Sequence, residues 1–132
     1  MKKPLVFISY SHKDLSWVRE FAQALKKFEV NVWLDEWQIQ AGESIVEALE
    51  MGLRESDAII AIVSKYNVDS PNIYFELGVA LGLGKKLIPI IEEGLEPSLI
   101  PFDLRTRRFL TRGSPSDVAK QVAQSVVIDS NE

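Results

Sequence analysis

The six-residue run Ala58–Val63 (AIIAIV) is apolar at every position, so a strand made from it would be apolar on both faces. Such a strand belongs in the middle of a parallel sheet that helices cover on both sides. Other apolar runs occur at Pro4–Ser9, Val30–Leu34 and Lys86–Ile91, and segments with helical spacing alternate with them. This alternation predicts an α/β fold built on a parallel sheet.

The remaining elements complete a doubly wound pattern. Helices are expected from about Asp14 to Phe28, from a cap at Ser44 to about Leu53, from Ser70 to Gly82 or Gly84, and from Ser114 and Pro115 to about Val127. A polar loop is expected from Asp35 to Glu43, and a weak fifth strand around Arg107–Leu110. We therefore expect a flavodoxin-like five-stranded parallel sheet in the order 2-1-3-4-5, with helices on both faces. It would form a single domain over residues 1–128, followed by a frayed tail at residues 129–132.

Composition excludes several classes of function. The chain has 132 residues, of which 46% are hydrophobic, and a net charge of -4, whereas nucleic-acid binding needs a concentrated excess of Lys and Arg. It has no cysteine and a single histidine, His12, so neither a thiolate site nor a histidine cluster for a metal can form. No apolar run is long enough to span a membrane. We expect a cytoplasmic protein that binds neither nucleic acid, nor membrane, nor metal.

The predicted topology places a ligand crevice where the winding of the sheet reverses, at the carboxyl ends of strands one and three. Ser9, Tyr10 and Ser11 follow strand one, and residues 64–69 follow strand three. Asp35 and Trp37, in the loop after strand two, can close over this crevice. Hydroxyls, amides, an aromatic ring and a carboxylate suit a sugar or a nucleoside.

Glu76 is the only charged residue between Ser70 and Gly84, a run that reads SPNIYFELGVALGLG and otherwise favours burial. Ser followed by Pro is typical of a helix start, which places Glu76 on the second turn of an apolar helix. A partly desolvated carboxylate in a cleft is a candidate for chemistry. The alternative is a glutamate at the helix edge that points to water.

Four segments in order resemble a TIR domain of the bacterial type. They are FISYSHKD with Asp14, WLDEWQIQAGESI with Asp35 and Gly42, the strand AIIAIVS, and Ser70 placed six residues before Glu76. The resemblance spans nearly the whole chain. One position departs from the pattern, because the family often has Trp two residues after that serine and this chain has Asn72.

The resemblance implies an NAD glycohydrolase that releases nicotinamide and linear or cyclic ADP-ribose, with NAD as substrate and no further cofactor. The family's catalytic glutamate falls on Glu76, and its substrate-binding positions fall on Ser9, Tyr10, Ser11, Asp35, Trp37 and Ser70. The family's loop for homotypic self-assembly falls on Asp35–Glu43, here with Glu36, Gln38, Ile39 and Gly42. A signalling or defence effector activated by self-assembly is the role that the resemblance implies.

Two other functions remain open on the sequence. TIR-like domains also act as non-catalytic adaptors that assemble with one another. The segment from Pro71 to Ile90 is also similar to nucleoside deoxyribosyltransferases, which share the sheet and a catalytic glutamate. Trp37 either packs on the surface or stacks on a base, and His12 is interpreted as a solvated loop residue. The basic cluster Arg105, Arg107, Arg108 and Arg112 is interpreted as a charged guard on an edge strand.

Overall fold

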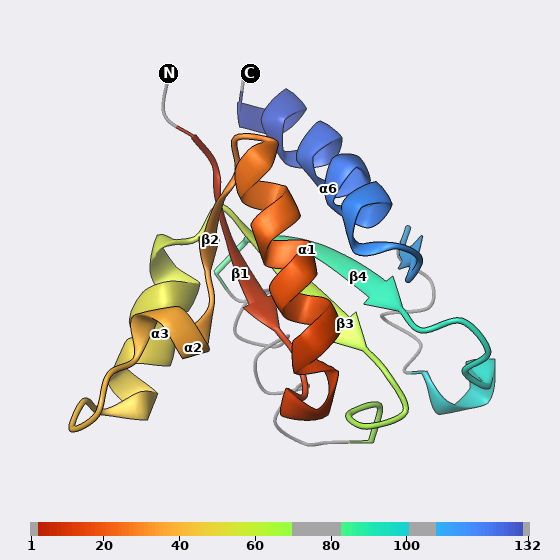
Figure 1. The fold of residues 1–132 in the computed structure, drawn as a ribbon, viewed down its shortest axis with the longest axis horizontal. Coiled ribbons are helices and arrows are strands. Elements are labelled where there is room, and N and C mark those ends of the chain that lie inside the picture. Colours follow the sequence, from red (N-terminus) through yellow and green to blue (C-terminus); the bar gives the residue numbers. More distant parts are fainter. Residues whose placement is uncertain (1–2, 70–82, 101–107, 131–132) are drawn as a thin grey trace.

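The computed structural model describes residues 3–69, 83–100 and 108–130, in which strands and helices alternate (Figure 1). The strands are β1 (Leu5–Ser9), β2 (Asn31–Trp33), β3 (Ala58–Val63), β4 (Lys86–Ile91) and β5 (Leu110–Thr111). The helices are α1 (Leu15–Lys27), α2 (Asp35–Gln38), α3 (Ile45–Glu55) and α6 (Pro115–Ser130), with short 3-10 turns at His12–Asp14 and Pro97–Leu99.

The five strands form one sheet in the order β2-β1-β3-β4-β5, and every neighbouring pair is parallel. This confirms the predicted order and the doubly wound fold. β3 lies at the centre, and none of its residues is more than 1% exposed. The register pairs Val6 of β1 with Ala58 of β3, and Ala58 with Lys86 of β4. The carboxyl ends of β1 and β3 therefore meet at the same edge of the sheet.

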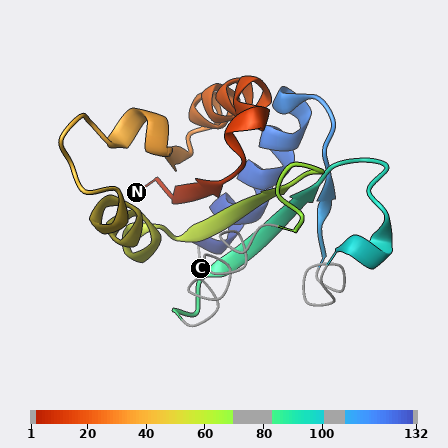
Figure 2. The ribbon, with the colours of Figure 1, turned by 90° about the horizontal axis from the view of Figure 1, so that it is seen from below.

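Two apolar clusters lie on opposite faces of the sheet, because alternate residues of each strand point to opposite sides. α1 and α6 cover one face and contact each other, while α3 lies on the other face (Figure 2). On the α3 side, the rings of Phe7 and Trp33 stack with centres 4.8 Å apart. Gly52 of α3 lies directly against that tryptophan, since a Cβ at this position would be 2.5 Å from the Trp33 Cε2 atom.

Most predicted boundaries agree with the structure. β3 and β4 begin and end where the sequence places them, and the Ser44 side chain caps α3 by accepting a hydrogen bond from the Glu47 amide. The helix expected from Ser70 to Gly82 or Gly84 lies almost wholly outside the described residues.

Three expectations need correction. The polar loop from Asp35 begins with a helical turn, α2, in which the Gln38 and Ile39 amides donate to the Leu34 and Asp35 carbonyls at 3.1 Å and 3.0 Å. The fifth strand is Leu110–Thr111, since its register follows Ile90 and Ile91 of β4. α6 continues past its expected end near Val127 to Ser130, and no Gly or Pro interrupts it.

Candidate functional site

The loops that follow β1 and β3 lie side by side at the end of the sheet where the winding reverses (Figure 1). Ser9 is buried and ends β1. Ser11 accepts a hydrogen bond from the Lys13 amide and so caps the 3-10 turn His12–Asp14. In sheets of this kind, ligands bind at such a reversal. The structure thus places Ser9 and Ser11 at the strand ends where the sequence predicts a crevice; their part in binding stays a prediction.

Tyr10, His12 and Asp35 form a side-chain cluster that joins the loop after β1 to α2. The Tyr10 hydroxyl donates to Asp35 Oδ1 at 2.6 Å, and His12 Nε2 lies 2.9 Å from Asp35 Oδ2. The Tyr10 and His12 rings stack with centres 5.2 Å apart. The His12 side chain is largely exposed, as expected of a solvated residue, and in addition it contacts Asp35. Both carboxylate oxygens of Asp35 already have partners in this cluster.

The environment of the Tyr10 phenol predicts an unusual titration. Burial, and then the hydrogen bond to Asp35, raise the pKa of Tyr10 above its ordinary value of about 10. Below about pH 10 the phenol is protonated in both the folded and the unfolded chain, so the raised pKa does not change stability there. Above about pH 10 the phenol ionises in the unfolded chain first, and the fold therefore loses stability as the pH rises. We expect Tyr10→Phe to leave the phenolate absorbance of the folded protein unchanged between about pH 9 and pH 11. A smaller signal in the variant would contradict the raised pKa.

α2 is held against α1 by two further contacts. The Arg19 guanidinium pairs with the Glu36 carboxylate, and this hydrogen bond lowers the pKa of Glu36. Trp37 is half-buried against the core, and the Lys26 ammonium lies 4.7 Å from the centre of its ring. These contacts favour packing over base stacking for Trp37, whose part in binding stays a prediction.

The residues of the predicted assembly loop differ in how far their side chains are exposed. Glu36, Gln38 and Gly42 are exposed, while Ile39 is half-buried against the apolar cluster on the α3 side. Gly42 has a φ of 88°, a conformation that favours glycine because it has no Cβ. The loop therefore presents mostly polar side chains to solvent.

A buried charged group that sequence reasoning missed lies beneath the crevice. Asp14, 5% exposed, accepts hydrogen bonds from Ser64 Oγ at 2.6 Å and from Arg112 at 2.8 Å. The Arg112 guanidinium also lies 4.7 Å from the centre of the Trp17 ring. Arg112 thus faces the interior, and its interpretation as part of an edge guard is wrong. The sequence names Asp14 only within the FISYSHKD segment and Arg112 only within a basic cluster, and neither context indicates that the two side chains pair.

The candidate catalytic residue, Glu76, and the candidate binding residue Ser70 lie outside the described residues. The structure accordingly brings together Ser9, Tyr10, Ser11 and Asp35, with Trp37 packed on α1. Within residues 3–69, 83–100 and 108–130, no group of three His, Asp or Glu side chains is placed to hold a metal ion. No helix in these ranges is both long and apolar enough to cross a membrane.

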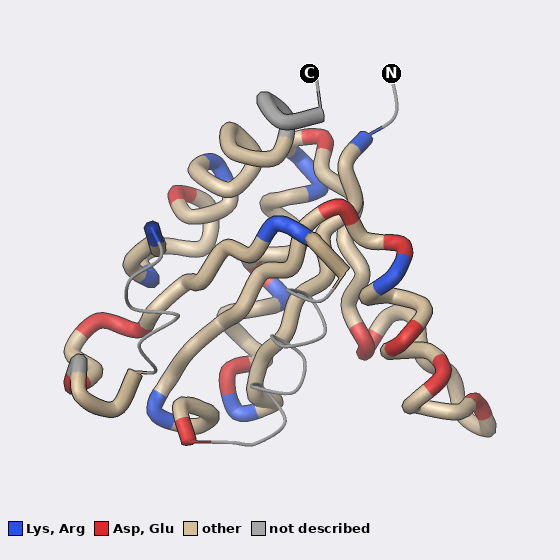
Figure 3. The backbone as a smooth tube through the Cα atoms, turned by 180° about the vertical axis from the view of Figure 1, so that it is seen from behind, with Lys and Arg blue, Asp and Glu red and all other residues tan. Residues whose placement is uncertain are grey.

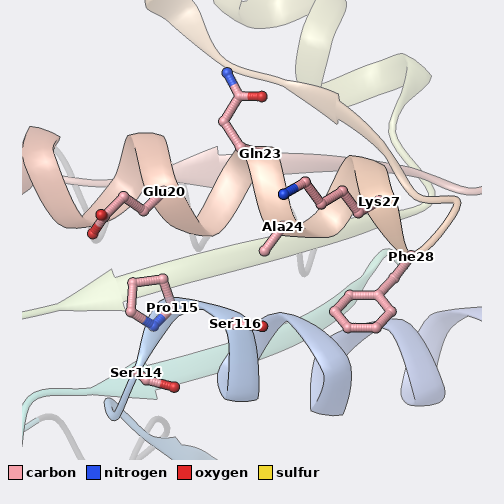
Figure 4. A pocket seen from close by; sticks show the side chains of 8 residues that line it. All are labelled: Glu20, Gln23, Ala24, Lys27, Phe28, Ser114, Pro115 and Ser116. Carbon is pink, nitrogen blue, oxygen red and sulfur yellow. The ribbon is translucent and has the colours of Figure 1, made fainter.

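Two hollows lie elsewhere on the described surface. One, of about 410 Å³, lies between α1 and the start of α6, with Phe28 and Pro115 among its walls (Figure 4). The other, of about 450 Å³, lies between the end of α2 and α3 and is lined by Trp33, Glu43 and Glu47, among others. Neither contains a residue that follows β1 or β3. The candidate site at the strand ends rests on the topology of the sheet and not on either hollow.

Comparison with known proteins agrees with the fold. A 52-residue segment is 38% identical to the 2' cyclic ADP-D-ribose synthase AbTIR of Acinetobacter baumannii, covering 39% of this chain and 19% of that protein. A 61-residue segment is 36% identical to the NAD(+) hydrolase TcpA of a Theionarchaea archaeon, covering 46% of this chain and 18% of the relative. The matches thus span about a fifth of the length of each curated relative.

A solved structure and a family model extend the likeness to nearly the whole chain. The TIR domain of the Toll-related receptor TRR-2 from Hydra magnipapillata superposes with a TM-score of 0.73 at 17% identity, covering 95% of both chains, which shows a shared fold. The family model described as TIR domain matches residues 6–124. On the strength of that match, the chain belongs to the TIR domain family.

Proposed function

We propose that this chain is an NAD glycohydrolase that cleaves the bond between nicotinamide and ribose and releases linear or cyclic ADP-ribose. One observation carries the proposal: the chain is a TIR domain, and segments of it are 36% and 38% identical to proteins named as an NAD(+) hydrolase and a cyclic ADP-ribose synthase. The crevice at the ends of β1 and β3 is the proposed location of the reaction.

The proposed chemistry needs a single carboxylate. Nicotinamide in NAD is a pyridinium and leaves as a neutral molecule, so its departure requires no general acid, unlike the two-carboxylate hydrolysis of an ordinary glycoside. We assign the carboxylate role to Glu76. It either stabilises the developing positive charge on the ribose or captures it covalently.

Substrate binding is assigned to Ser9, Tyr10, Ser11, Asp35, Trp37 and Ser70. The described contacts add one condition to this assignment. Because both oxygens of Asp35 are engaged by Tyr10 and His12, a ribose hydroxyl that bonds to Asp35 must share or replace one of those partners. Substrate binding and the position of α2 are thus expected to be linked.

The direct test is nicotinamide release from NAD by concentrated, purified protein, with the ADP-ribose products separated by chromatography. A deoxynucleoside with a free base serves as a second substrate. Nicotinamide release supports the proposal. Base exchange on the deoxynucleoside, without nicotinamide release, would make the transferase function correct, and no reaction with either substrate at high protein concentration would favour an adaptor.

Self-assembly is the second part of the proposal, and α3 provides an observation in its favour. Ile45, Val46 and Met51 are exposed on this helix beside the loop after β2, and Val46 is 73% exposed. Acidic positions gather along the same helix and loop (Figure 3). Large apolar side chains exposed on one helix favour an interaction surface there. We assign contacts between copies to this helix and to the loop that contains Glu36, Gln38, Ile39 and Gly42.

Activity per molecule is expected to rise with protein concentration, because assembly would bring this surface against another copy. Val46→Glu should flatten the rise, since it places a charge at the most exposed of these three apolar positions without disturbing the core. The matched control is Leu99→Glu, a similarly exposed position away from α3. Nicotinamide release is measured over a wide concentration range for all three proteins. Constant specific activity in the wild-type chain would contradict activation by assembly.

In the cell, we propose that NAD cleavage serves signalling or defence, as the family resemblance implies. The corresponding measurement is the NAD content of cells that express the chain. An unchanged NAD content alongside activity of the purified protein would argue against this role.

A further inference from the structure

Two lysines from different loops converge on one aromatic ring at the crevice. Lys13 belongs to the 3-10 turn after β1, and Lys65 and Tyr66 follow β3. The Lys13 and Lys65 ammonium nitrogens lie 5.5 Å and 5.2 Å from the centre of the Tyr66 ring. Attraction between an ammonium and an aromatic face favours such contacts. Two positive charges are therefore gathered at the rim of the site, around a ring that is itself partly exposed.

The backbone beneath the two lysines is firmly held. The residue after Lys13 is Asp14 and the residue before Lys65 is Ser64, and these two side chains share a hydrogen bond of 2.6 Å. The Lys65 amide donates to the Glu92 carboxylate at 2.8 Å. The spacing between the two lysine-bearing loops is therefore fixed before any ligand arrives, which lowers the entropic cost of binding.

Hydrogen bonds within the loop after β3 add to this rigidity. The Asn67 side chain accepts from the Ser64 amide and donates to the Ile62 carbonyl, at 2.8 Å and 2.7 Å. The Tyr66 amide donates to Ser64 Oγ at 3.2 Å. The backbone of Lys65 and Tyr66 is thus held in place by hydrogen bonds, and a ligand would contact their side chains.

Among the described residues, Asp14 and Glu92 place carboxylates beside these two loops, but neither carboxylate pairs with a lysine ammonium. Asp14 lies close by in sequence, yet its charge is compensated by Arg112 at 2.8 Å. In the part of the chain that the structure describes, neither lysine forms an ion pair with a carboxylate, although the whole chain carries a net charge of -4. Two like charges held near each other repel and gain from an anion placed between them.

We infer that Lys13 and Lys65 bind the diphosphate group of a dinucleotide. This inference rests on the proposed function and names the part of NAD that the two loops would hold. Lysine ammonium groups bind phosphate oxygens as point charges, and two of them approaching from separate loops can each contact one phosphate. The location at the carboxyl ends of β1 and β3 fits, because ligands of such sheets bind there. The lysines would anchor the substrate without touching the bond that breaks.

The test compares Lys13→Gln/Lys65→Gln with Lys27→Gln/Lys120→Gln, a control that loses the same charge at exposed positions on α1 and α6. Calorimetry measures binding of ADP-ribose, inorganic pyrophosphate and nicotinamide riboside to the full chain. We expect the affinity for ADP-ribose and pyrophosphate to fall about tenfold or more in the first variant, as loss of charged hydrogen bonds implies, and to stay near wild type in the control. Binding of nicotinamide riboside, which has no diphosphate, should not change.

Kinetics with NAD provide the second measurement. The same substitution should raise KM much more than it lowers kcat, because an anchor remote from the reacting bond contributes to ground-state and transition-state binding alike. Lysine-dependent binding of ADP-ribose in a chain that releases no nicotinamide would support the diphosphate site while contradicting the proposed function. Equal affinity of wild type and variant for ADP-ribose and pyrophosphate, or no binding of either to the wild-type chain, would overturn the inference.

Discussion

Glu76→Gln is expected to slow nicotinamide release from NAD by about a hundredfold or more. The substitution keeps the size of the side chain and removes its charge, so it removes the proposed stabilisation of the developing positive charge on the ribose. It also removes the nucleophile if the reaction passes through a covalent intermediate. The measurement is nicotinamide release at saturating NAD, in parallel with wild type at the same protein concentration.

The control for this experiment is Glu20→Gln, the same chemical change at an exposed position of α1. It should retain activity within a few-fold. Circular dichroism and thermal unfolding of both variants would establish that each one folds. Activity of Glu76→Gln within a few-fold of wild type would refute the assignment of the catalytic carboxylate, whatever the control shows.

Asp14→Ala is expected to destabilise the fold by about 3–5 kcal/mol. The substitution leaves the Arg112 guanidinium without its carboxylate partner in a place where that side chain is 18% exposed, and it removes the acceptor of the Ser64 hydroxyl. Breaking a buried ion pair from one side is costly because the remaining charge stays poorly solvated. Urea denaturation of wild type and variant measures the loss.

A double-mutant cycle separates the ion pair from other effects of the substitution. Asp14→Ala combined with Arg112→Leu removes both charges and should recover part of the lost stability. Asp69→Ala, at an exposed carboxylate in the loop after β3, is the matched control and should change stability by about 0.5 kcal/mol or less. A loss of this small size in Asp14→Ala would show that the pair contributes little to the fold.

The elements that the sequence predicts best are those whose signal is local. Ala58–Val63 is apolar on both faces and is bounded by polar residues, so these residues alone predict a buried strand and its two ends. Ser44 caps α3 through a bond to an amide three residues away, which is also a local property. By contrast, the position of β5 follows from its register with Ile90 and Ile91, which nothing within its own two residues specifies.

The loops that meet at the candidate site were predictable because the order of the strands decides which loops are neighbours. That order places Ser9 and Tyr10 beside the loop after β3, and the structure confirms the neighbourhood. The side chains that pair with one another at this end of the sheet were not predictable. Asp14 and Arg112 are 98 residues apart in sequence, and the chain offers many carboxylates and guanidinium groups that such a pair could have used.

The two outer strands of the sheet have a consequence for how copies of this domain can join. β2 has three residues and β5 has two, so the described part of the sheet offers almost no unpaired backbone at either side. An extended peptide or a second sheet needs a longer run of free amide and carbonyl groups to add itself as a further strand. Contacts between copies should therefore be made by side chains on helices and loops. Association and dissociation of the copies should leave the amount of β-structure unchanged.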